Sequence, residues 1–512
     1  MKKISAALCS LMVLSAVLCA CGDNASVTTQ TDNMESGVSM TETDTQEAGE
    51  LKISDVLDES LDFGGEEVKM IVEMGWSGID QMYRSLYAEE DSPDIVDSAV
   101  YQRNLAVQEA LNVKIADPEQ VNPKELLAAV EKVIRSGDDV YDVVAGYQAY
   151  SVSGSALNYF LNYEDVPHID IEKPYWATKY IDEMSYNGTY WVTGDITTLY
   201  TGGFIGTYVN KRLLDSISPD DNIYDIVRSG KWTIDVMREY AQQVYLDLNN
   251  NGVTDIPDQV GMAYPFIDMY TFGCGVQYTE RAADGSLKLN LMSEKTANIW
   301  EKLSHMIENT NGIMNINDFQ SAPEYKDYGN HMGLYFAEGN CLFVTGVLCY
   351  TFEELRDMKD DFYLIPCPKF DEAQESYMTQ ITDNVTIFGI PITTAHTERT
   401  GAVLEAMAIE SYRVLRPTYY ETALKEKYTR NEESAEMVDI IRSSITTDFG
   451  LIYSEAIGGG IGSSGKGLFR IFRTADTEGS DTITSLYEKN SKAYESNFAE
   501  LLSVYEQQAN DN

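Results

Sequence analysis

Hydrophobic runs and helically spaced apolar residues alternate along the first part of the chain. The apolar stretch VKMIVE predicts a buried strand, and Leu126, Val130 and Ile134 recur at the spacing of one helix face. Such an alternation predicts a parallel sheet covered by helices. Ligands of these sheets bind at the carboxyl ends of strands, here Gly75-Trp76 and Gly146-Tyr147. The elements expected in this part are strands at Val68–Glu73, Asn112–Ala116 and Val140–Ala145, and helices at Ile95–Leu111 and from Pro123 to Ile134.

Similar patterns predict elements in the rest of the chain. Thr233 is a good N-cap, and Asp235 favours the dipole of the helix that follows. Trp232 can pack on Met237, and Trp300 lies on the apolar stripe of another helix, so we interpret both tryptophans as structural. The expected elements are strands at Gly203–Asn210, Cys341–Thr345, Phe362–Ile365 and Val385–Ile390, and helices at Thr233–Leu246, Glu294–Thr310, Glu398–Tyr412 and Thr482–Gln507.

The first residues have the pattern of an export signal. Lys2 and Lys3 precede an apolar run from Ile4 to Leu18, which is too short for a good membrane span. The run ends in Leu-Cys-Ala-Cys-Gly, which resembles a bacterial lipobox whose last cysteine, Cys21, receives the lipid. The alternative is an ordinary cleaved signal with an incidental cysteine. We expect residues 1–20 to be a lipoprotein signal peptide and the lipid on Cys21 to anchor the protein to the extracellular face of the cell membrane.

An acidic linker is expected after the lipidated N-terminus, over residues 21–50. Residues 22–50 contain seven acidic residues and nine Ser or Thr, but no Lys, Arg or aromatic residue. Such a segment cannot bury enough apolar surface to fold. We therefore predict a disordered tether.

The net charge of the chain limits the classes of molecule that it can bind. There are 37 Lys and Arg against 82 Asp and Glu, a net charge of −45. A surface this acidic is repelled by nucleic acid and by anionic lipid, so we predict no nucleic-acid partner. The chain also holds 34 tyrosines, which suit a binding surface that needs aromatic rings.

An acidic loop has the spacing of a calcium site. Its oxygen donors occupy positions 1, 3, 5, 7, 9 and 12 of an EF-hand-like loop, with Gly252 at the turn, and Asp stands at position 12 where Glu is usual. The alternative is a plain acidic turn, because Asn-Asn-Gly favours turns without any metal. A bound Ca²⁺ would be structural, and we expect no catalytic cofactor. The candidate ligands are Asp247, Asn249, Asn251, Val253, Asp255 and Asp258.

The order and spacing of several segments resemble the family 1 extracellular solute-binding proteins of ABC importers, in particular the carbohydrate-binding lipoproteins of Gram-positive bacteria. No single motif is very specific. The matching segments are Cys21, Gly194-Asp195, Tyr208–Lys211, Lys231–Asp235, the acidic loop followed by Val260-Gly261, Phe336–Asn340, Leu364–Pro368 and Tyr419–Glu421.

The resemblance implies an α/β, two-lobed, periplasmic-binding-protein-like fold of type II, with a hinge and an interlobe cleft. The chain would cross between lobes near 203–209, near 340 and near 385–390. The implied N-lobe is 51–204 plus 341–387, and the implied C-lobe is 205–340 plus 388–440. The helical segment 441–512 is not assigned to either lobe.

A neutral glycan site combines aromatic platforms with polar side chains that bind hydroxyl groups. Candidates lie at expected strand ends, beside Gly194, after the acidic loop and at an expected crossing. Any single one of them is more often a core or surface residue than a ligand contact, and the prediction rests on the set as a whole. The candidate ligand-binding residues are Trp76, Tyr147, Trp191, Asp195, Tyr264, Phe266, Asp383 and Asn384.

The remaining motifs do not indicate a catalytic or nucleotide-binding function. Residues 460–467 (GIGSSGKG) have the glycine spacing of a phosphate-binding loop, but Gly467 occupies the position where Mg²⁺ binding needs Ser or Thr. We therefore expect a flexible loop at the cleft rim. The four histidines are scattered, and neither H-E-x-x-H nor G-x-S-x-G occurs. Export permits disulfides and four cysteines allow three pairings, but a large core does not need them, so we expect buried thiols. These cysteines are Cys274, Cys341, Cys349 and Cys367.

The sequence therefore favours a monomeric, lipid-anchored receptor and not an enzyme. It would capture an oligosaccharide and deliver it to the permease of an ABC importer. Two alternatives remain open. One is a surface enzyme that acts on polysaccharide through a carboxylate pair. The other is the same receptor role for a peptide or a polyamine, which an acidic protein could suit.

Overall fold

A computed structural model of the chain describes residues 51–74, 81–89, 92–319, 332–348, 354–355, 357–420, 432–463, 465–479 and 483–511. The described residues all belong to one compact unit of the chain. The expected signal peptide, Cys21, the acidic linker, Trp76 and Cys349 lie outside the described residues and stay predictions.

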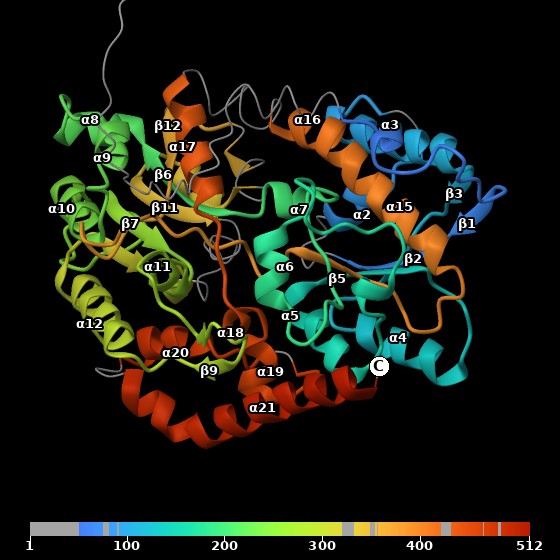
Figure 1. Cartoon of the computed structure of the whole chain (residues 1–512). Helices are drawn as coiled ribbons and strands as arrows, with labels where there is room; N and C mark the ends of the chain where they lie inside the picture. Colours follow the sequence, from blue (N-terminus) through green and yellow to red (C-terminus); the bar gives the residue numbers. More distant parts are fainter. Residues whose placement is uncertain are drawn as a thin grey trace, which may run out of the picture. The chain divides into compact units, whose positions relative to one another are not determined.

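The first lobe is built on a parallel sheet that one later strand completes (Figure 1). Its strands are β1 (Glu66–Val68), β2 (Met70–Glu73), β3 (Val113–Ile115), β4 (Glu119–Val121), β5 (Val143–Tyr147) and β13 (Thr386–Gly389). In the order β13-β5-β2-β4, β2 pairs in parallel with β4 and β5, while β13 is antiparallel to β5. Both β2 and β5 are buried along their whole length, as in sheets covered on both faces. β1 and β3 form a separate parallel pair.

Helices cover this sheet and confirm the expected alternation. They are η1 (Ile53–Asp55), α2 (Gln81–Leu86), α3 (Ile95–Leu111), α4 (Leu126–Ser136), α5 (Gln148–Ser151), η2 (Val152–Leu157), η3 (Tyr163–Asp165), α6 (Thr178–Met184), α7 (Thr198–Thr201), α15 (Thr397–Glu410), the π-helical turn η5 (Ser411–Leu415) and α16 (Arg416–Tyr420). α3 begins where the carboxylate of Asp94 accepts hydrogen bonds from the backbone N–H groups of Val96 and Asp97. α15 is buried over most of its length and packs against α3.

A buried carboxylate stands in α15. Glu405 is fully buried, and it accepts hydrogen bonds from the hydroxyl of Tyr175 and, at 2.9 Å, from the indole N–H of Trp176. Burial raises the pKa of Glu405 to about 7 from its ordinary value of 4.5, against the smaller, lowering effect of these hydrogen bonds. The protonated carboxyl is therefore the form that the folded protein favours.

Replacing Glu405 with glutamine is expected to flatten the pH dependence of stability. The stability that Glu405 contributes is fully present below pH 4.5 and is lost as the pH rises through about 7. The free energy of unfolding of the parent protein should thus fall across that window by up to about 3 kcal/mol more than that of Glu405→Gln. Urea unfolding at several pH values measures this difference. Glu109→Gln, at an exposed position on α3, is the control. Parallel profiles for parent and Glu405→Gln would contradict the expectation.

The second lobe is built on a mixed sheet in the order β10-β7-β11-β6-β12. Its strands, with the separate hairpin β8-β9, are β6 (Ile205–Asn210), β7 (Val260–Tyr264), β8 (Thr279–Arg281), β9 (Leu287–Leu289), β10 (Ile313–Asn315), β11 (Cys341–Val347) and β12 (Phe362–Ile365). Its helices are α8 (Lys211–Ile217), α9 (Ile223–Arg228), α10 (Ile234–Val244), α11 (Asp268–Gly273), α12 (Glu294–Asn309), η4 (Ile316–Phe319), α13 (Met332–Ala337) and α17 (Glu432–Ser443). As expected, Thr233 caps α10, with its hydroxyl accepting from the backbone N–H of Val236. Trp232 and Trp300 are both buried.

Strand pairing corrects the lobe assignment that the resemblance implied. β11 and β12 lie within 341–387, which was expected in the N-lobe, but both pair with β6 in the sheet of the second lobe. Conversely, α15 lies within 388–440, which was expected in the C-lobe, but it packs on α3 of the first lobe. The crossing expected near 340 is absent from the described residues there, because α13 packs on β11 and β11 pairs in parallel with β7.

The C-terminal segment contacts both lobes. It consists of α18 (Phe449–Ile452), α19 (Ser454–Gly459), α20 (Arg470–Glu478) and α21 (Ile483–Asp511). α21 packs against α12 of the second lobe at one end and against η2 of the first lobe at the other (Figure 1). At the first-lobe end, the amide of Gln508 donates to the carbonyl of Ser155 at 2.9 Å, and the hydroxyl of Tyr505 lies 2.5 Å from the Ser155 hydroxyl. One helix therefore ties the two lobes together.

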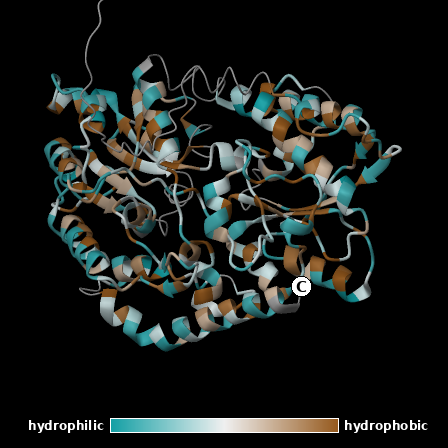
Figure 2. Ribbon diagram, in the orientation of Figure 1, coloured by the Kyte–Doolittle hydropathy of each residue, from teal (hydrophilic) through white to brown (hydrophobic). Residues whose placement is uncertain are grey.

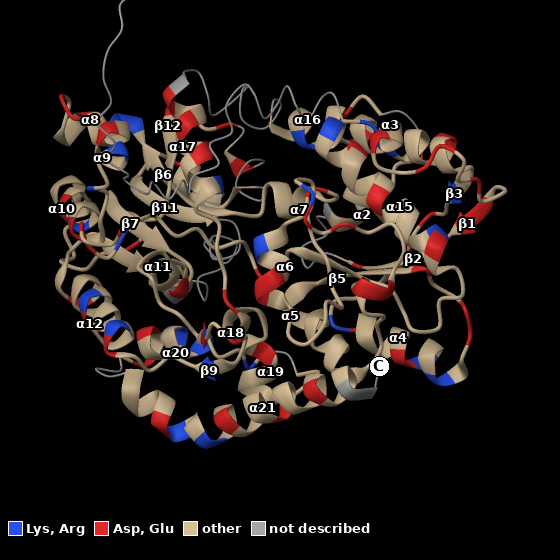
Figure 3. Ribbon diagram, in the orientation of Figure 1, with Lys and Arg blue, Asp and Glu red and all other residues tan. Residues whose placement is uncertain are grey.

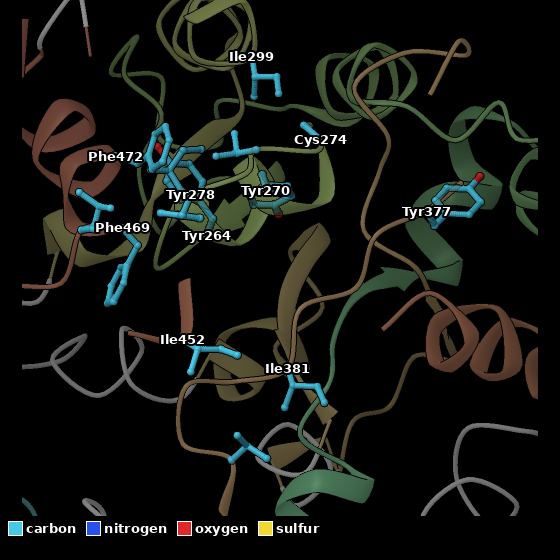
Figure 4. Close-up of a cluster of buried hydrophobic side chains, with 14 of the residues drawn as sticks. Tyr264, Tyr270, Cys274, Tyr278, Ile299, Tyr377, Ile381, Ile452, Phe469 and Phe472 are labelled. Carbon is cyan, nitrogen blue, oxygen red and sulfur yellow. The ribbon is translucent and has the colours of Figure 1, made fainter. Parts of the chain in front are cut away.

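The core is aromatic as well as aliphatic. Strands of both sheets are largely hydrophobic, whereas charged residues gather on the outer helices (Figures 2 and 3). Figure 4 shows Tyr264, Tyr278 and Phe472 grouped in the second lobe, with Phe469 beside them. The free thiols of Cys274, Cys341 and Cys367 are buried, as expected; burial also raises the pKa of each thiol. Among the described helices, none combines the length and apolarity that a membrane crossing requires.

Candidate ligand site between the two lobes

Segments from three parts of the chain run side by side where the lobes join. Phe204, just before β6, bridges Ile381, and Thr379 bridges Ile445. The backbone N–H of Ile205 donates to the carbonyl of Gln380 at 2.9 Å. The crossings are thus at the start of β6, as the resemblance implied, and in the residues that precede β13. This arrangement places the carboxyl end of β5 next to the second lobe.

A pocket lies at this junction and takes its lining from both lobes. Its lining includes Gln148, Tyr180, Asp268, Asp383, Phe469 and Arg473. Its volume is about 50 Å³, whereas ligand pockets commonly measure roughly 300–1,000 Å³. This conformation therefore has room for a few water molecules only, and a larger ligand would fit only if the lobes moved apart.

The end of β5 positions the first-lobe side of the pocket. Gln148 begins α5, and its backbone N–H donates to the carbonyl of Val385 at 3.0 Å. The next N–H, of Ala149, donates to the carbonyl of Asp383 at 3.0 Å. The side-chain carbonyl oxygen of Gln148 accepts a hydrogen bond from the hydroxyl of Tyr180. Gln148 and Asp383 are therefore held together at a strand end, where α/β sheets bind ligands.

An arginine between two rings forms the opposite side. The Arg473 guanidinium donates to both carboxylate oxygens of Asp268, at 2.6 and 2.8 Å. Its central carbon lies 3.9 Å from the ring centroid of Phe266 and 4.6 Å from that of Phe469. A bidentate pair with ring stacking fixes the guanidinium in one orientation. α11, which carries Asp268, and α20, which carries Arg473, are thereby joined.

Asp383 is a charged side chain of the pocket lining for which the described residues provide no hydrogen bond or ion pair. It is half-buried, and burial raises its pKa, which the guanidinium of Arg473 lowers in part. Asn384 is also half-buried and its backbone N–H donates to the Thr382 hydroxyl at 3.4 Å. Of the candidate residues from the sequence, Asp383 lines the pocket and Phe266 packs on the arginine that lines it.

Four other candidates lie in the core. Trp191 is 1% exposed and donates its indole N–H to the carbonyl of Val152, and Tyr264 is 0% exposed and donates to Asp476. Tyr147 is buried at the end of β5. Asp195 pairs with Arg416 at 3.2 Å. These side chains thus have packing or pairing roles here, and none of the four is part of the lining of the junction pocket.

Several residues of the pocket lining are not predicted from the sequence. Gln148 directly follows the strand end Gly146-Tyr147, so the strand-end rule could have included it. Asp268, Phe469 and Arg473 carry no local signal, because their role depends on the packing of α20 against α11. The loop after α19 was expected at the cleft rim; the N–H of Gly462 donates to the Ser153 hydroxyl of the first lobe at 3.1 Å.

A second pocket lies on the surface of the second lobe, between α10 and α12. Its volume is about 410 Å³, and its lining includes Asp235, Arg238, Lys302 and Phe370. Lys302 is already paired with Asp235 at 2.6 Å and donates to the carbonyl of Phe370 at 2.6 Å. The lining comes from one lobe, so closure of two lobes would not change it. We therefore regard the junction pocket as the better candidate despite its smaller volume.

The acidic loop is closed by its own hydrogen bonds. Asp255 accepts from the side-chain amides of Asn249 and Asn251 at 2.7 to 3.1 Å, and Asp247 accepts from the N–H of Gly252 at 2.8 Å. Asp258 is buried and accepts from the N–H of Leu248 at 2.9 Å. Across the described residues, no set of three or more His, Cys, Asp and Glu side chains is placed to hold a metal. Several of the expected ligand residues nevertheless hydrogen-bond to one another within this one turn.

Solved structures match the fold. The GacH receptor of Streptomyces glaucescens GLA.O, whose structures are unliganded and in complex with acarbose, matches with a TM-score of 0.50 and 11% sequence identity over 85% of this chain and 99% of that chain. A cyclo/maltodextrin-binding protein complexed with maltotetraose matches with a TM-score of 0.51 and 10% identity over 86% of this chain and 97% of that chain. No family model and no curated protein sequence matches. The chain has the two-lobed α/β fold of solute-binding proteins.

Proposed function

We propose that this protein is a receptor that captures a sugar or oligosaccharide between its lobes and delivers it to the permease of an ABC importer. The observation that carries the proposal is the pocket at the crossings, to which Gln148 of the first lobe and Arg473 of the C-terminal segment both contribute. The fold supports it, because structures with this fold include receptors solved with oligosaccharides. In this role the ligand leaves unaltered, so the protein is not an enzyme.

Lobe closure would couple capture to delivery. A ligand that touches both lobes contacts them together only in the closed state, so it shifts the equilibrium toward closure. The permease would then recognise the closed form. The lipid on Cys21 would hold this receptor, as a monomer, at the extracellular face of the membrane, a localisation supported by the sequence pattern of the first residues.

A thermal-shift screen of mono- and oligosaccharides, with peptides and polyamines beside them, tests this function. At least one saccharide should raise the melting temperature, as any ligand that binds only the folded state does. Gln148→Ala should lose the shift, while Gln102→Ala, at an exposed position on α3, should keep it. Binding of peptides alone, or release of a cleaved saccharide in chromatography, would contradict the proposal.

We also propose that the acidic loop holds a structural Ca²⁺. Asp247, Asp255 and Asp258 would supply carboxylate oxygens, with Asn249 and Asn251 turning their amide oxygens toward the ion and Val253 offering its carbonyl. The convergence of these side chains on Asp255 supports the proposal. The ion would stiffen the loop and take no part in ligand chemistry.

Addition of Ca²⁺ after EGTA treatment is expected to raise the melting temperature. At a concentration 100 times the dissociation constant, the gain in unfolding free energy is about 2.7 kcal/mol. Asp255→Asn should remove this rise. Asp284→Asn, which changes an exposed turn elsewhere, should preserve it. Equal melting temperatures with Ca²⁺ and with EGTA would show that hydrogen bonds alone close the loop.

A further inference from the structure

The charges that line the junction pocket do not balance. Asp268 is neutralised by the bidentate guanidinium of Arg473. Behind the lining, Glu455 pairs with Arg470 at 3.0 Å. The side chain of Asp383 has no hydrogen bond or ion pair within the part of the chain that the structure describes. One negative charge is therefore left over in a pocket between two lobes.

Two aromatic rings at the pocket, Phe266 and Phe469, are already in contact with arginine side chains. The guanidinium of Arg473 lies between Phe266 and Phe469, and that of Arg470 lies 5.0 Å from the centroid of Phe469. A sugar that relied on stacking would compete with these contacts. The electrostatic feature that remains open to a ligand is the carboxylate of Asp383.

Closure of the lobes raises the free-energy cost of leaving the Asp383 carboxylate without a partner. As the lobes close and water leaves, an ionised group without a partner becomes costly. Neutral hydroxyl groups could donate hydrogen bonds to it but would leave the charge uncompensated. An ammonium group donates hydrogen bonds and also neutralises the charge, and such charge-assisted hydrogen bonds are the stronger kind.

We propose that the ligand of the junction pocket is a saccharide that carries a protonated amino group, which pairs with Asp383. The side-chain amide N–H groups of Gln148, whose carbonyl oxygen is taken by Tyr180, donate to hydroxyl groups of the same ligand. Asp383 is thus the residue that selects amino sugars over neutral ones. This inference rests on the proposed carbohydrate-binding function and deepens it.

Calorimetric titration with matched sugars tests the inference. The amino probes are glucosamine, galactosamine, mannosamine and the β-1,4-linked glucosamine trisaccharide. Each is compared with its hydroxyl parent and its N-acetyl derivative, which keep the ring but lack the charge. At least one amino probe should bind roughly 10- to 100-fold more tightly than both counterparts. Asp383→Asn should reduce that probe to the affinity of its parent. Glu375→Gln, which removes one charge from an exposed position, should leave the preference intact.

The outcomes separate this inference from the function on which it rests. Equal or tighter binding of the hydroxyl parents, failure of every amino probe to bind, or a preference that survives Asp383→Asn overturns the inference. If a neutral saccharide binds while the amino preference is absent, the proposed function stands without it. If no saccharide of any kind binds, the proposed function fails as well. The melting temperature of Asp383→Asn verifies that the variant is folded.

Discussion

Replacing Arg473 with methionine is expected to lower the affinity for the saccharide found in the screen by more than about 100-fold and the unfolding free energy by about 3 kcal/mol. The variant leaves Asp268, which is buried, without its bidentate partner. It also removes the guanidinium that holds Phe266 and Phe469 together. Calorimetric titration and urea unfolding measure the two effects.

Two further variants separate the causes of that loss. Arg473→Lys keeps the charge but cannot reproduce the planar fork, so it should be intermediate. The double variant Asp268→Asn with Arg473→Met leaves no unpaired charge at position 268, so its stability should recover in part while binding stays weak. If Arg473→Met bound the saccharide as tightly as the parent, the junction pocket would not be the ligand site.

Replacing Tyr505 with alanine is expected to cost about 4 kcal/mol and to free one end of α21 from the first lobe. Tyr505 is 1% exposed, its hydroxyl lies 2.6 Å from that of Tyr453, and its ring packs near Tyr190 at 5.9 Å between centroids. Amide hydrogen exchange should quicken in the C-terminal half of α21 and in η2, and stay slow in α12.

Tyr505→Phe is the matched control for this helix. It keeps the ring and loses the hydroxyl contacts with Ser155 and Tyr453, so it should cost about 1 kcal/mol. If the alanine variant quickened exchange equally in both lobes, α21 would be part of a single core and not a tie between two lobes. Because α21 joins both lobes, its first-lobe contacts limit how far the lobes can open.

Local signals explain which elements the sequence could predict. The helix at Ile95–Leu111 has the expected bounds because Asp94 caps it, and the helix after Thr233 follows from its cap in the same way. Strand positions are also close to those expected, since a short apolar run such as β12 begins after two aspartates and ends before Pro366. These features depend on neighbours in sequence, which the chain displays directly.

The sheet to which a strand belongs and the burial of a side chain depend on long-range contacts, which local sequence patterns do not reveal. The pairing of β11 with β6 joins residues far apart in the chain, and no local pattern distinguishes it from a place in the other sheet. Trp191 and Tyr264 were reasonable sugar platforms by residue type, but residue type does not reveal burial. Asp383, which lines the pocket, can be selected from the sequence because it lies at an expected crossing, whereas Arg473 reaches the pocket only through the packing of α20.

The proposed receptor role requires the lobes to open and close. The junction pocket holds about 50 Å³ in this conformation, so under the proposal a saccharide would enter only after the lobes separate at the crossings near Phe204 and Ile381. Binding would then draw Gln148 and Arg473 toward the same molecule. The free energy of closing comes from contacts that exist only when both sides are engaged.

A crystal structure of the protein with the saccharide found in the screen tests the central claim most directly. The account predicts that the ligand lies at the junction, within hydrogen-bond distance of Gln148 and Asp383 on one side and in contact with Phe469 or Arg473 on the other. A ligand bound instead in the surface pocket between α10 and α12, or touching one lobe alone, would contradict it.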